Sequence, residues 1–321
     1  MNNVTIAYHH PCSDGFCSAW LAHRAGFDGR FVGVNYGDID ELYVEGKVLI
    51  CLDFSFTAEE LNKLKVLYER IFILDHHATA IDNMRPLGLI SDDSIYVEKD
   101  NVVAIFDKKR SGAGLTDSFI LAIYNCIVGD KPFEFYDIGF ANTLALYCQD
   151  RDLWQHKLSF TYEINALIKL LPFEFDAWDN FYVEMINRFG QLVEKGKVLV
   201  QYREQLIKQA YDDTSYAFLT MVTGEGKDIE LVAYKVGLCL SPNAELHSDI
   251  GNYICNNSDV DFAIVFKTQS DKVSLRSVGD FNVRAIAEIF GGGGHHNAAG
   301  CSKEILEKFY KGFSNDVTRI H

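Results

Sequence analysis

Acidic and imidazole side chains follow short apolar segments in the first half of this 321-residue chain. The clearest case is residues 71–79, IFILDHHAT, in which four apolar residues precede Asp75, His76 and His77. The full set is His9, Asp14, Asp53, Asp75, His76, His77 and Asp150. Carboxylates with imidazoles suit Mn²⁺ or a similar octahedral ion. So many ligands exceed the needs of one ion and predict a pair about 3.5–4 Å apart, which would activate water and neutralise phosphoryl oxygens.

Short strands and helices must position these side chains. The expected strands are Val4–Tyr8, Phe31–Tyr36, Val48–Leu52 and Ile71–Leu74, with a further one at Val102–Phe106. Segments whose apolar residues have helical spacing separate several of these strands. Thr57 and Glu60 form a capping box at the start of one such helix. Strands alternating with helices predict a parallel sheet, and ligands bind beyond the carboxyl ends of such strands. An alternative for Ser13 or Asp14 is that it only caps the next helix.

The second half of the chain has a different pattern. A long helix is expected over Ala177–Tyr211, with breaks near Gly190 and Gly196, and a shorter one over Phe135–Tyr147. From Ser215 onward, strands and hairpins predominate. The predicted fold is therefore α/β, with a parallel-sheet domain joined by a long helix to a smaller mixed α/β domain. The predicted boundaries are 1–178 for the first domain, 179–213 for the connecting helix and 214–321 for the second domain.

A glycine run in the second domain is a candidate phosphate-binding segment. Glycines permit positive φ and let backbone amides approach a ligand closely, and two histidines and an asparagine follow them directly. An arginine in SLRSV could grip a phosphate with its planar fork. The predicted substrate-binding residues are Arg276, Gly292, Gly293, Gly294, His295, His296 and Asn297. A flexible loop is the alternative interpretation of such a run.

The composition restricts the partners. A net charge of −15 and a pI near 5.1 provide no global basic field for long duplex DNA, but a local site can still bind a short phosphorylated ligand. The eight cysteines form no C-x-x-C pair, which favours a reducing, cytoplasmic location. No signal peptide or transmembrane run is evident, so no membrane partner is expected. The sequence leaves open whether the chain forms a homodimer.

Two motifs together resemble those of the DHH phosphoesterase superfamily. Leu74–His77 is similar to its LDHH motif, and Gly291–Gly300 is similar to the GGGGH-x-x-AAG stretch of its DHHA1 partner domain. The resemblance covers nearly the whole chain and implies two Mn²⁺ ions. The ligands it implies are His9, Asp14, a bridging Asp53, His76 and Asp150.

The resemblance also implies other roles. Asp75 and His77 would orient ligands and contact the attacking water or leaving group, so that Asp75, His76 and His77 form the predicted catalytic group. Asp150 is preferred to Asp152 because the family's fourth acid commonly lies four residues before an aromatic residue, here Trp154. The arginine, histidines and asparagine of the second domain would hold the phosphate and sugar of a terminal nucleotide.

One residue departs from the family pattern. Cys12 stands where the first motif, Asp-x-Asp-Gly, usually has its first aspartate. A thiolate ligand would shift the preference of the site toward Zn²⁺ or Co²⁺. If Cys12 does not bind metal, the site would be weaker or would hold one ion. Cys12 thus bears on metal number and identity more than on the class of reaction.

The resulting functional expectation is a Mn-dependent phosphodiesterase of the exonuclease or oligoribonuclease type. It would hydrolyse short single-stranded oligonucleotides or dinucleotides to mononucleotides with metal-activated water. One alternative is a phosphomonoesterase acting on a small nucleotide such as a 3′,5′-bisphosphate. Another is a nucleotide-binding sensor that lost catalytic power with the aspartate at position 12.

Overall fold

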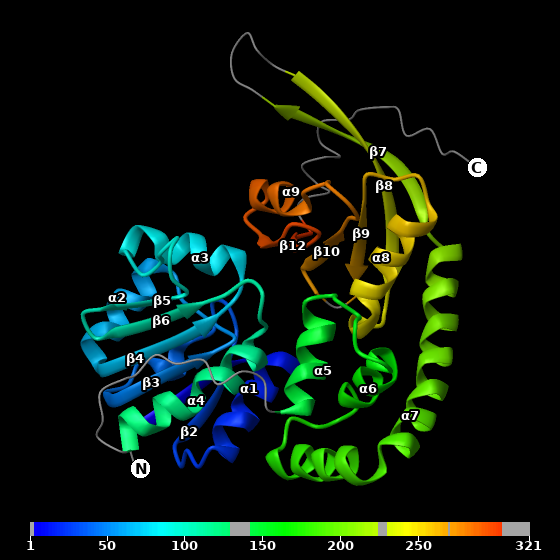
Figure 1. Cartoon of the computed structure of the whole chain (residues 1–321). Helices are drawn as coiled ribbons and strands as arrows, with labels where there is room; N and C mark the ends of the chain where they lie inside the picture. Colours follow the sequence, from blue (N-terminus) through cyan, green and yellow to red (C-terminus); the bar gives the residue numbers. More distant parts are fainter. Residues whose placement is uncertain (1–2, 129–141, 224–229, 269, 304–321) are drawn as a thin grey trace. The chain divides into compact units, whose positions relative to one another are not determined.

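The computed structural model describes residues 3–128, 142–223, 230–268 and 270–303 (Figure 1). The chain divides into two compact units, Met1–Val200 and Gln201–His321, which we describe separately. Each unit contains a six-stranded sheet, and the long helix α7 (Phe175–Asp212) runs from one unit into the other. The predicted α/β fold, with two sheet domains joined by a long helix, is thus confirmed.

The sheet of the first unit has the order β2-β1-β3-β4-β6-β5. Its strands are β1 (Val4–His9), β2 (Arg30–Val34), β3 (Gly46–Leu52), β4 (Tyr68–Asp75), β5 (Tyr96–Lys99) and β6 (Val102–Phe106). All neighbours are parallel except β5, which pairs antiparallel with β6 at the edge. Tyr8 pairs with Leu52, Leu52 with Leu74 and Asp75 with Phe106, so four strands end at one level.

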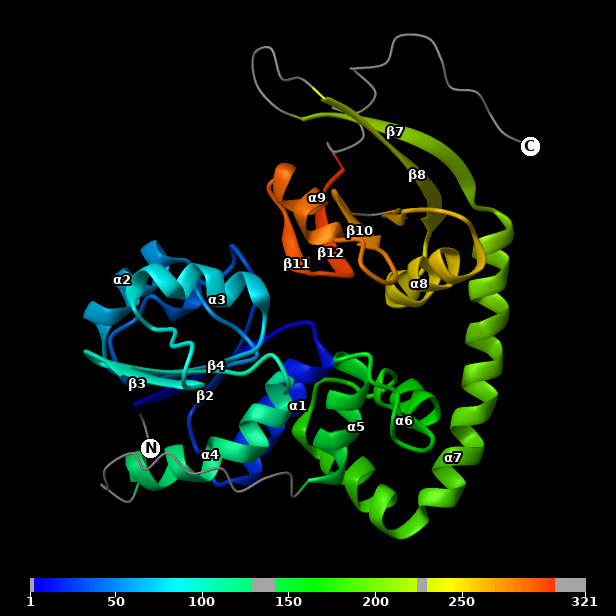
Figure 2. The ribbon, with the colours of Figure 1, turned by 45° about the horizontal axis from the view of Figure 1, so that its top comes forward.

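Helices cover both faces of this sheet, because successive strand residues point to opposite sides. Leu49 and Ile71 pack in the cluster that includes α2 (Ala58–Leu67) and α3 (Ala78–Met84), with the short helices η1 (Asp40–Leu42) and η2 (Arg85–Leu87). Ile50 and Phe72 pack on the other face, with α1 (Ser13–Arg24) and α4 (Gly112–Val128) (Figure 2). The predicted capping box of Thr57 and Glu60 begins α2.

A helical cluster packs beside α1. It contains α5 (Thr143–Asp152), α6 (Thr161–Ile168) and the first part of α7, whose Trp178 lies in one core with Trp20 of α1. Within α7 the non-helical backbone falls at Arg188 (φ −139°) rather than at a glycine. Residues 135–141 of the helix predicted over Phe135–Tyr147 lie outside the described residues.

The sheet of the second unit has the order β11-β12-β10-β9-β8-β7 and is antiparallel except between β8 and β9. Its elements are β7 (Ser215–Thr223), β8 (Glu230–Ser241), η3 (Ala244–Leu246), α8 (His247–Asn257), β9 (Phe262–Lys267), β10 (Lys272–Arg276), α9 (Val283–Ile289), β11 (Gly293–His295) and β12 (Ala298–Ser302). Helix α8 was not anticipated from the sequence. In the described part of the chain, no helix is long and apolar enough to span a membrane.

Candidate metal centre

Asp53 lies at the centre of the polar cluster at the carboxyl ends of β1, β3 and β4. It follows β3 directly with a left-handed backbone (φ 56°), a conformation that aspartate tolerates better than most residues. Its amide donates to the Leu74 carbonyl at 2.9 Å, which ties this turn to the neighbouring strand. The carboxylate is 1% exposed. The chain thus fixes one buried acid between two strand ends.

The two oxygens of Asp53 lie near different imidazoles. Oδ1 is 3.2 Å from Nε2 of His76, and Oδ2 is 3.4 Å from Nδ1 of His9. Oδ1 of Asp53 and Nδ1 of His9 are buried and have no hydrogen-bond partner among the described residues. Buried polar atoms normally have a partner. The Asp53 carboxylate is thus placed so that it could bridge two positively charged groups.

Three groups of side chains have ligand atoms that all lie within 4.8 Å of one another. They are Asp53, Asp75, His76 and His77; His9, Cys12 and Asp53; and Asp14, His76 and Asp152. Asp53 and His76 each belong to two of them. The described residues therefore offer a candidate divalent metal site with room for more than one ligand set.

Asp75 organises the two histidines that follow it. Its Oδ1 accepts from the amides of His76 and His77 at 2.7 and 3.1 Å, and lies 2.7 Å from Nδ1 of His77. Asp75 is fully buried, and its Oδ2 has no hydrogen-bond partner among the described residues. This contact fixes the ring of His77 and places the donor hydrogen on Nδ1. The other ring nitrogen of His77 is Nε2.

The ionisable groups of the cluster perturb one another strongly. Burial alone would lower the pKa of His76, but the adjacent Asp53 carboxylate and the charges of Asp152 and Asp14 raise this pKa to about 10. Burial likewise opposes the Asp75 contact at His77, which nonetheless raises its pKa to about 9. For Asp53, burial would raise the pKa, yet the His76 and His9 imidazoles hold it well below its usual range. The cluster attracts positive charge.

Asp14 is bound at the N-terminus of α4. Ser111 Oγ donates to its Oδ1 at 2.7 Å, and the amides of Gly112 and Ala113 donate to Oδ2 and Oδ1 at 2.6 and 3.1 Å. Burial and the charges of Asp53 and Asp152 raise the pKa of Asp14 well above its ordinary value. These contacts leave the cap of α1 to Cys12, whose side chain makes no capping hydrogen bond.

Ser111 and Gly112 were not predicted as site residues. A Cβ on Gly112 would lie 2.3 Å from Cβ of Asp53, so only glycine allows α4 to approach the central carboxylate this closely. The signal in the sequence was a Ser-Gly pair between the β6 strand and an apolar helix, the same arrangement that first singled out Asp14. Ser111 and Gly112 position the acids of the site.

The two acids near the end of α5 have different surroundings. Asp150 accepts from the amides of Lys157 and Leu158 at 2.8 and 3.2 Å, so both of its oxygens hold the following loop. Asp152 Oδ2 instead lies 3.4 Å from Nε2 of His76. Residues two apart on a helix point in nearly opposite directions. The structure thus leaves Asp150 outside the cluster, and we propose Asp152 in its place as a ligand.

Cys12 lies beside His9 and Asp53, with its sulfur in the same group of potential ligand atoms. Burial, followed by the charges of Asp53, Asp152 and Asp14, raises the pKa of its thiol well above the ordinary value. Without a cation nearby, this sulfur keeps its proton. Cys12 is therefore a potential soft ligand for a metal ion bound beside the Asp53 carboxylate.

In the second unit, two of the predicted ligand-binding side chains, Arg276 and Asn297, donate hydrogen bonds to carbonyls and serine hydroxyls of that unit. Arg276 donates to the carbonyls of Leu275 and Ala299 at 2.7 and 3.3 Å and to Ser248 Oγ at 2.6 Å. The amide nitrogen of Asn297 donates to Ser277 Oγ and to the Gly279 carbonyl at 2.9 and 3.0 Å. These contacts hold together the sheet and the loop between β10 and α9.

The glycine run forms half of a tight hairpin. Gly293, Gly294 and His295 pair with residues 300, 299 and 298, which leaves His296 and Asn297 as the connecting residues. A Cβ on Gly292 would lie 2.0 Å from the Gly300 carbonyl oxygen, and Gly294 has a φ of 138°. Glycine is thus required at positions 292 and 294 by the close approach of β12. His296 is exposed at the tip.

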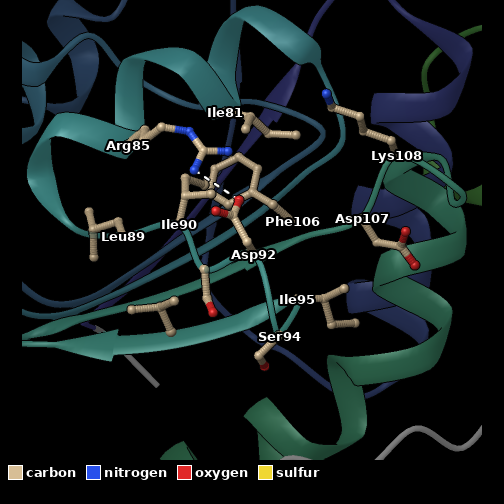
Figure 3. Close-up of a pocket in the computed structure, with 12 residues that line it drawn as sticks. Ile81, Arg85, Leu89, Ile90, Asp92, Ser94, Ile95, Phe106, Asp107 and Lys108 are labelled. Carbon is tan, nitrogen blue, oxygen red and sulfur yellow. Dashed lines mark hydrogen bonds and ion pairs between the residues drawn. The ribbon is translucent and has the colours of Figure 1, made fainter.

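A separate pocket of about 210 Å³ lies further along the same sheet edge, beyond β6 (Figure 3). Phe106, the register partner of Asp75, and Ile81 of α3 contribute apolar surface to it. Nη1 of Arg85 contacts Asp92 Oδ1 at 3.0 Å between its walls (Figure 3). Because these charges pair with one another, we assign no ligand to this pocket.

The cluster around Asp53 fits a divalent metal by its donor set and by its unpaired atoms. Four carboxylates (Asp14, Asp53, Asp75 and Asp152) are brought close to three imidazoles. Asp53 Oδ1, Asp75 Oδ2 and His9 Nδ1 are buried there and have no hydrogen-bond partner among the described residues. Isolated buried charges are costly and usually paired or bound to metal. Oxygen and imidazole ligands suit Mn²⁺ or Mg²⁺, while the thiol suits softer ions.

Comparisons with known proteins identify a family model and relatives of this chain. The family model of the DHHA1 domain matches residues 242–314. The chain is 38% identical over 271 residues to "Oligoribonuclease NrnB" of Bacillus subtilis (82% of this chain, 59% of that protein). It is 27% identical over 321 residues to "Uncharacterized protein R106" of Acanthamoeba polyphaga mimivirus (92% of this chain, 66% of that protein). It therefore spans less than two thirds of the length of either relative.

Among solved structures, RecJ from Thermus thermophilus in complex with Mn²⁺ matches with a TM-score of 0.47 and 14% identity, covering 99% of this chain and 53% of that one. An exopolyphosphatase-related protein from Bacteroides fragilis matches with the same score and 17% identity, covering 96% and 90%. The Asp75-His76-His77 motif within a carboxylate cluster and the DHHA1 match supply both parts of the expected pattern. The chain belongs to the DHH/DHHA1 phosphoesterase superfamily.

Proposed function

We propose that this protein is a metal-dependent phosphodiesterase that hydrolyses short single-stranded oligonucleotides or dinucleotides to mononucleotides. The observation that carries the proposal is the arrangement of Asp53, with one buried oxygen beside His76 and the other beside His9. The similarity to an oligoribonuclease supports the substrate class. The acidic net charge of −15 supports a short substrate over a long duplex.

The candidate ligands are His9, Asp14, Asp53, His76 and Asp152, with Cys12 as an additional one. Bound divalent ions at this place would lower the pKa of a water molecule and neutralise phosphoryl oxygens. The protein itself contributes fixed geometry, because Asp53 is anchored to β4 and Asp14 is anchored to α4. Holding the catalytic groups in fixed positions before the reaction is a large part of catalysis in phosphoryl transfer.

His77 is the proposed proton carrier. Asp75 holds its Nδ1 at 2.7 Å and raises the pKa of His77 to about 9 against the effect of burial. Nε2 is then able to donate a proton to the oxygen of a leaving nucleotide. Asp75 acts through His77 and is a positioning residue.

In the second unit, the exposed His296 is the side chain proposed to contact the substrate, and the backbone of the glycine hairpin is proposed to approach the phosphate. Arg276 and Asn297 support this hairpin through the contacts described above. Arg276 is also proposed to hold phosphate, as its residue type suggests.

The test is hydrolysis of a 5′-labelled RNA dinucleotide beside a longer single-stranded oligonucleotide, with Mn²⁺ and with EDTA. We expect Mn²⁺-dependent cleavage that favours the dinucleotide. Preference for the longer strand would assign the protein to exonucleases of long substrates. Cleavage of a 3′,5′-bisphosphate alone would establish a phosphomonoesterase. Tight binding of the dinucleotide without turnover in Mn²⁺, Co²⁺ or Zn²⁺ would indicate a sensor.

A further inference from the structure

Tyr36 lies beside the candidate metal centre in a tight turn after β2. Asn35 and Asp38 form a β-bridge across this turn, and the amide of Asp38 donates to the Asn35 carbonyl at 2.9 Å. The amide of Tyr36 donates to Asn35 Oδ1 at 2.8 Å, and Gly37 has a φ of 81°. These contacts give the tyrosine a defined backbone instead of a loose loop. The sequence alone placed this residue inside a strand.

The ring of Tyr36 contacts two histidines of the centre. Its centroid is 5.7 Å from that of His9 and 6.4 Å from that of His77, both edge-on, with interplanar angles of 62° and 83°. Phe54, which follows Asp53 and is 1% exposed, supports the ring at 4.9 Å. These three contacts fix the ring relative to the groups that would receive a phosphate.

The tyrosine is nevertheless 48% exposed. A ring held in a fixed position beside a polar site, with about half of the residue exposed, is accessible to a ligand bound there. Nucleobases stack on such rings, and stacking tolerates different base sequences because every base has a π face. Because the ring lies against His9 and His77, a nucleotide bound by its phosphate at the metal centre would have a base close to Tyr36.

We propose that Tyr36 is a stacking platform for a base of the nucleotide substrate and so makes the site selective for base-bearing phosphodiesters. This inference rests on the proposed function and names a residue that determines specificity. Stacking uses the face of the ring and does not require the hydroxyl. The structure therefore assigns to Tyr36 a contribution that phenylalanine can replace and leucine cannot.

The experiment compares Tyr36→Phe and Tyr36→Leu on three substrates. These are a diadenosine RNA dinucleotide and two analogues of it, each lacking one of the bases. We expect Tyr36→Leu to raise the KM for the dinucleotide by about tenfold or more, with a smaller effect on kcat, and Tyr36→Phe to stay within about twofold. One abasic analogue should show a raised KM in the wild type and no further penalty in Tyr36→Leu.

Two controls separate stacking from simple support of His9 and His77. Tyr43→Leu, a matched change before β3 at the opposite edge of the sheet, should leave the KM unchanged. Mn²⁺ affinity, measured by calorimetry, should be the same in Tyr36→Leu as in the wild type. If the leucine variant loses Mn²⁺ affinity, or if its KM rises equally for all three substrates, Tyr36 is only a structural support and the inference is overturned.

A binding measurement distinguishes failure of the inference from failure of the proposed function. A dinucleotide containing 2-aminopurine should lose fluorescence on binding to the wild type and Tyr36→Phe, through stacking, and keep it with Tyr36→Leu. If the wild type hydrolyses no dinucleotide but quenches this probe, the proposed function fails and the platform is retained. If the wild type binds the probe without quenching, or does not bind it, the platform is rejected.

Discussion

Each of the two sheets carries a segment rich in residue types that commonly bind ligands, the cluster around Asp53 and the glycine hairpin with Arg276. The polar atoms of the two segments have different partners. At the edge of the first sheet, Asp53 and Asp75 keep buried oxygens that no described residue satisfies by a hydrogen bond. In the second unit, Arg276 and Asn297 donate to backbone carbonyls and serine hydroxyls of the same sheet. Residue types suggested ligand binding in both places.

We infer from this difference that buried polar atoms without a hydrogen-bond partner indicate ligand binding more directly than residue type does. Unsatisfied acceptors gathered at one place require an external partner, because leaving them buried is costly. Satisfied donors have already contributed to holding the fold. On this basis, changes in the first segment should reduce metal binding and chemistry. Changes in the second segment should mainly reduce stability, apart from those at the exposed His296 and at Arg276, for which phosphate contact is also proposed.

Asp53→Asn should have the largest effect. The change keeps the shape of the side chain but removes the charge shared by His9 and His76. Since loss of a group that only supports a metal ligand costs about 10- to 100-fold, loss of the shared carboxylate should lower Mn²⁺ affinity and kcat/KM by more than about a hundredfold. Calorimetric titration with Mn²⁺ and dinucleotide hydrolysis measure both. Equal metal affinity in variant and wild type would remove Asp53 from the ligand set.

The pair Asp152→Asn and Asp150→Asn should separate the two acids of α5. For Asp152→Asn we expect Mn²⁺ affinity to fall by about 10- to 100-fold with the protein no less stable, because burial, with a contribution from the charge of Asp53, raises the pKa of Asp152. For Asp150→Asn we expect the free energy of unfolding to fall by about 1–2 kcal/mol, because two loop amides lose a charged acceptor. Urea unfolding with EDTA and Mn²⁺ titration measure these effects. The reverse pattern would restore Asp150 as the ligand.

Gly112→Ala should lower the stability of the first unit and the activity together. The new Cβ would lie 2.3 Å from Cβ of Asp53, so either α4 or the central acid must move, at a cost of about 1–3 kcal/mol. Gly190→Ala is the matched control, since a Cβ at that position of α7 meets nothing within 4 Å and alanine favours helix. Thermal unfolding and kcat should fall only in the first variant. Wild-type behaviour of Gly112→Ala would show that the approach of α4 is not tight.

Asn297→Ala and His296→Ala test the second unit. Loss of the Asn297 amide leaves Ser277 and the Gly279 carbonyl without a donor, so the free energy of unfolding should fall by about 1–3 kcal/mol. His296→Ala removes an exposed side chain and should change stability little while raising the KM. Denaturant unfolding and Michaelis–Menten kinetics check the split. A raised KM at unchanged stability in Asn297→Ala would return this asparagine to the ligand-binding residues.

Patterns in the sequence were sufficient for much of the fold but not for every side-chain role. Apolar runs marked β1, β3 and β4, and the capping box of Thr57 marked α2, because both depend on local chemistry. The choice between Asp150 and Asp152 depends on how α5 is rotated against α1, which is set by tertiary packing. The roles of Gly112 and Tyr36 depend on contacts with residues distant along the chain. The glycine hairpin was anticipated as a segment but not as a paired strand.

Cys12→Asp should have the smallest effect and sharpens the comparison within the metal centre itself. The sulfur lies with His9 and Asp53, whereas the ligand group of Asp14, His76 and Asp152 contains only oxygen and nitrogen. If Cys12 binds an ion, the wild type loaded with Co²⁺ should show a sulfur-to-cobalt charge-transfer band, which Cys12→Ser and Cys12→Asp should lack. Cys12→Asp should also shift the preference from Zn²⁺ and Co²⁺ toward Mn²⁺ by a few-fold, because a hard oxygen replaces a soft sulfur. Identical cobalt spectra in all three proteins would place Cys12 outside the ligand set, and the centre would then consist of carboxylates and imidazoles.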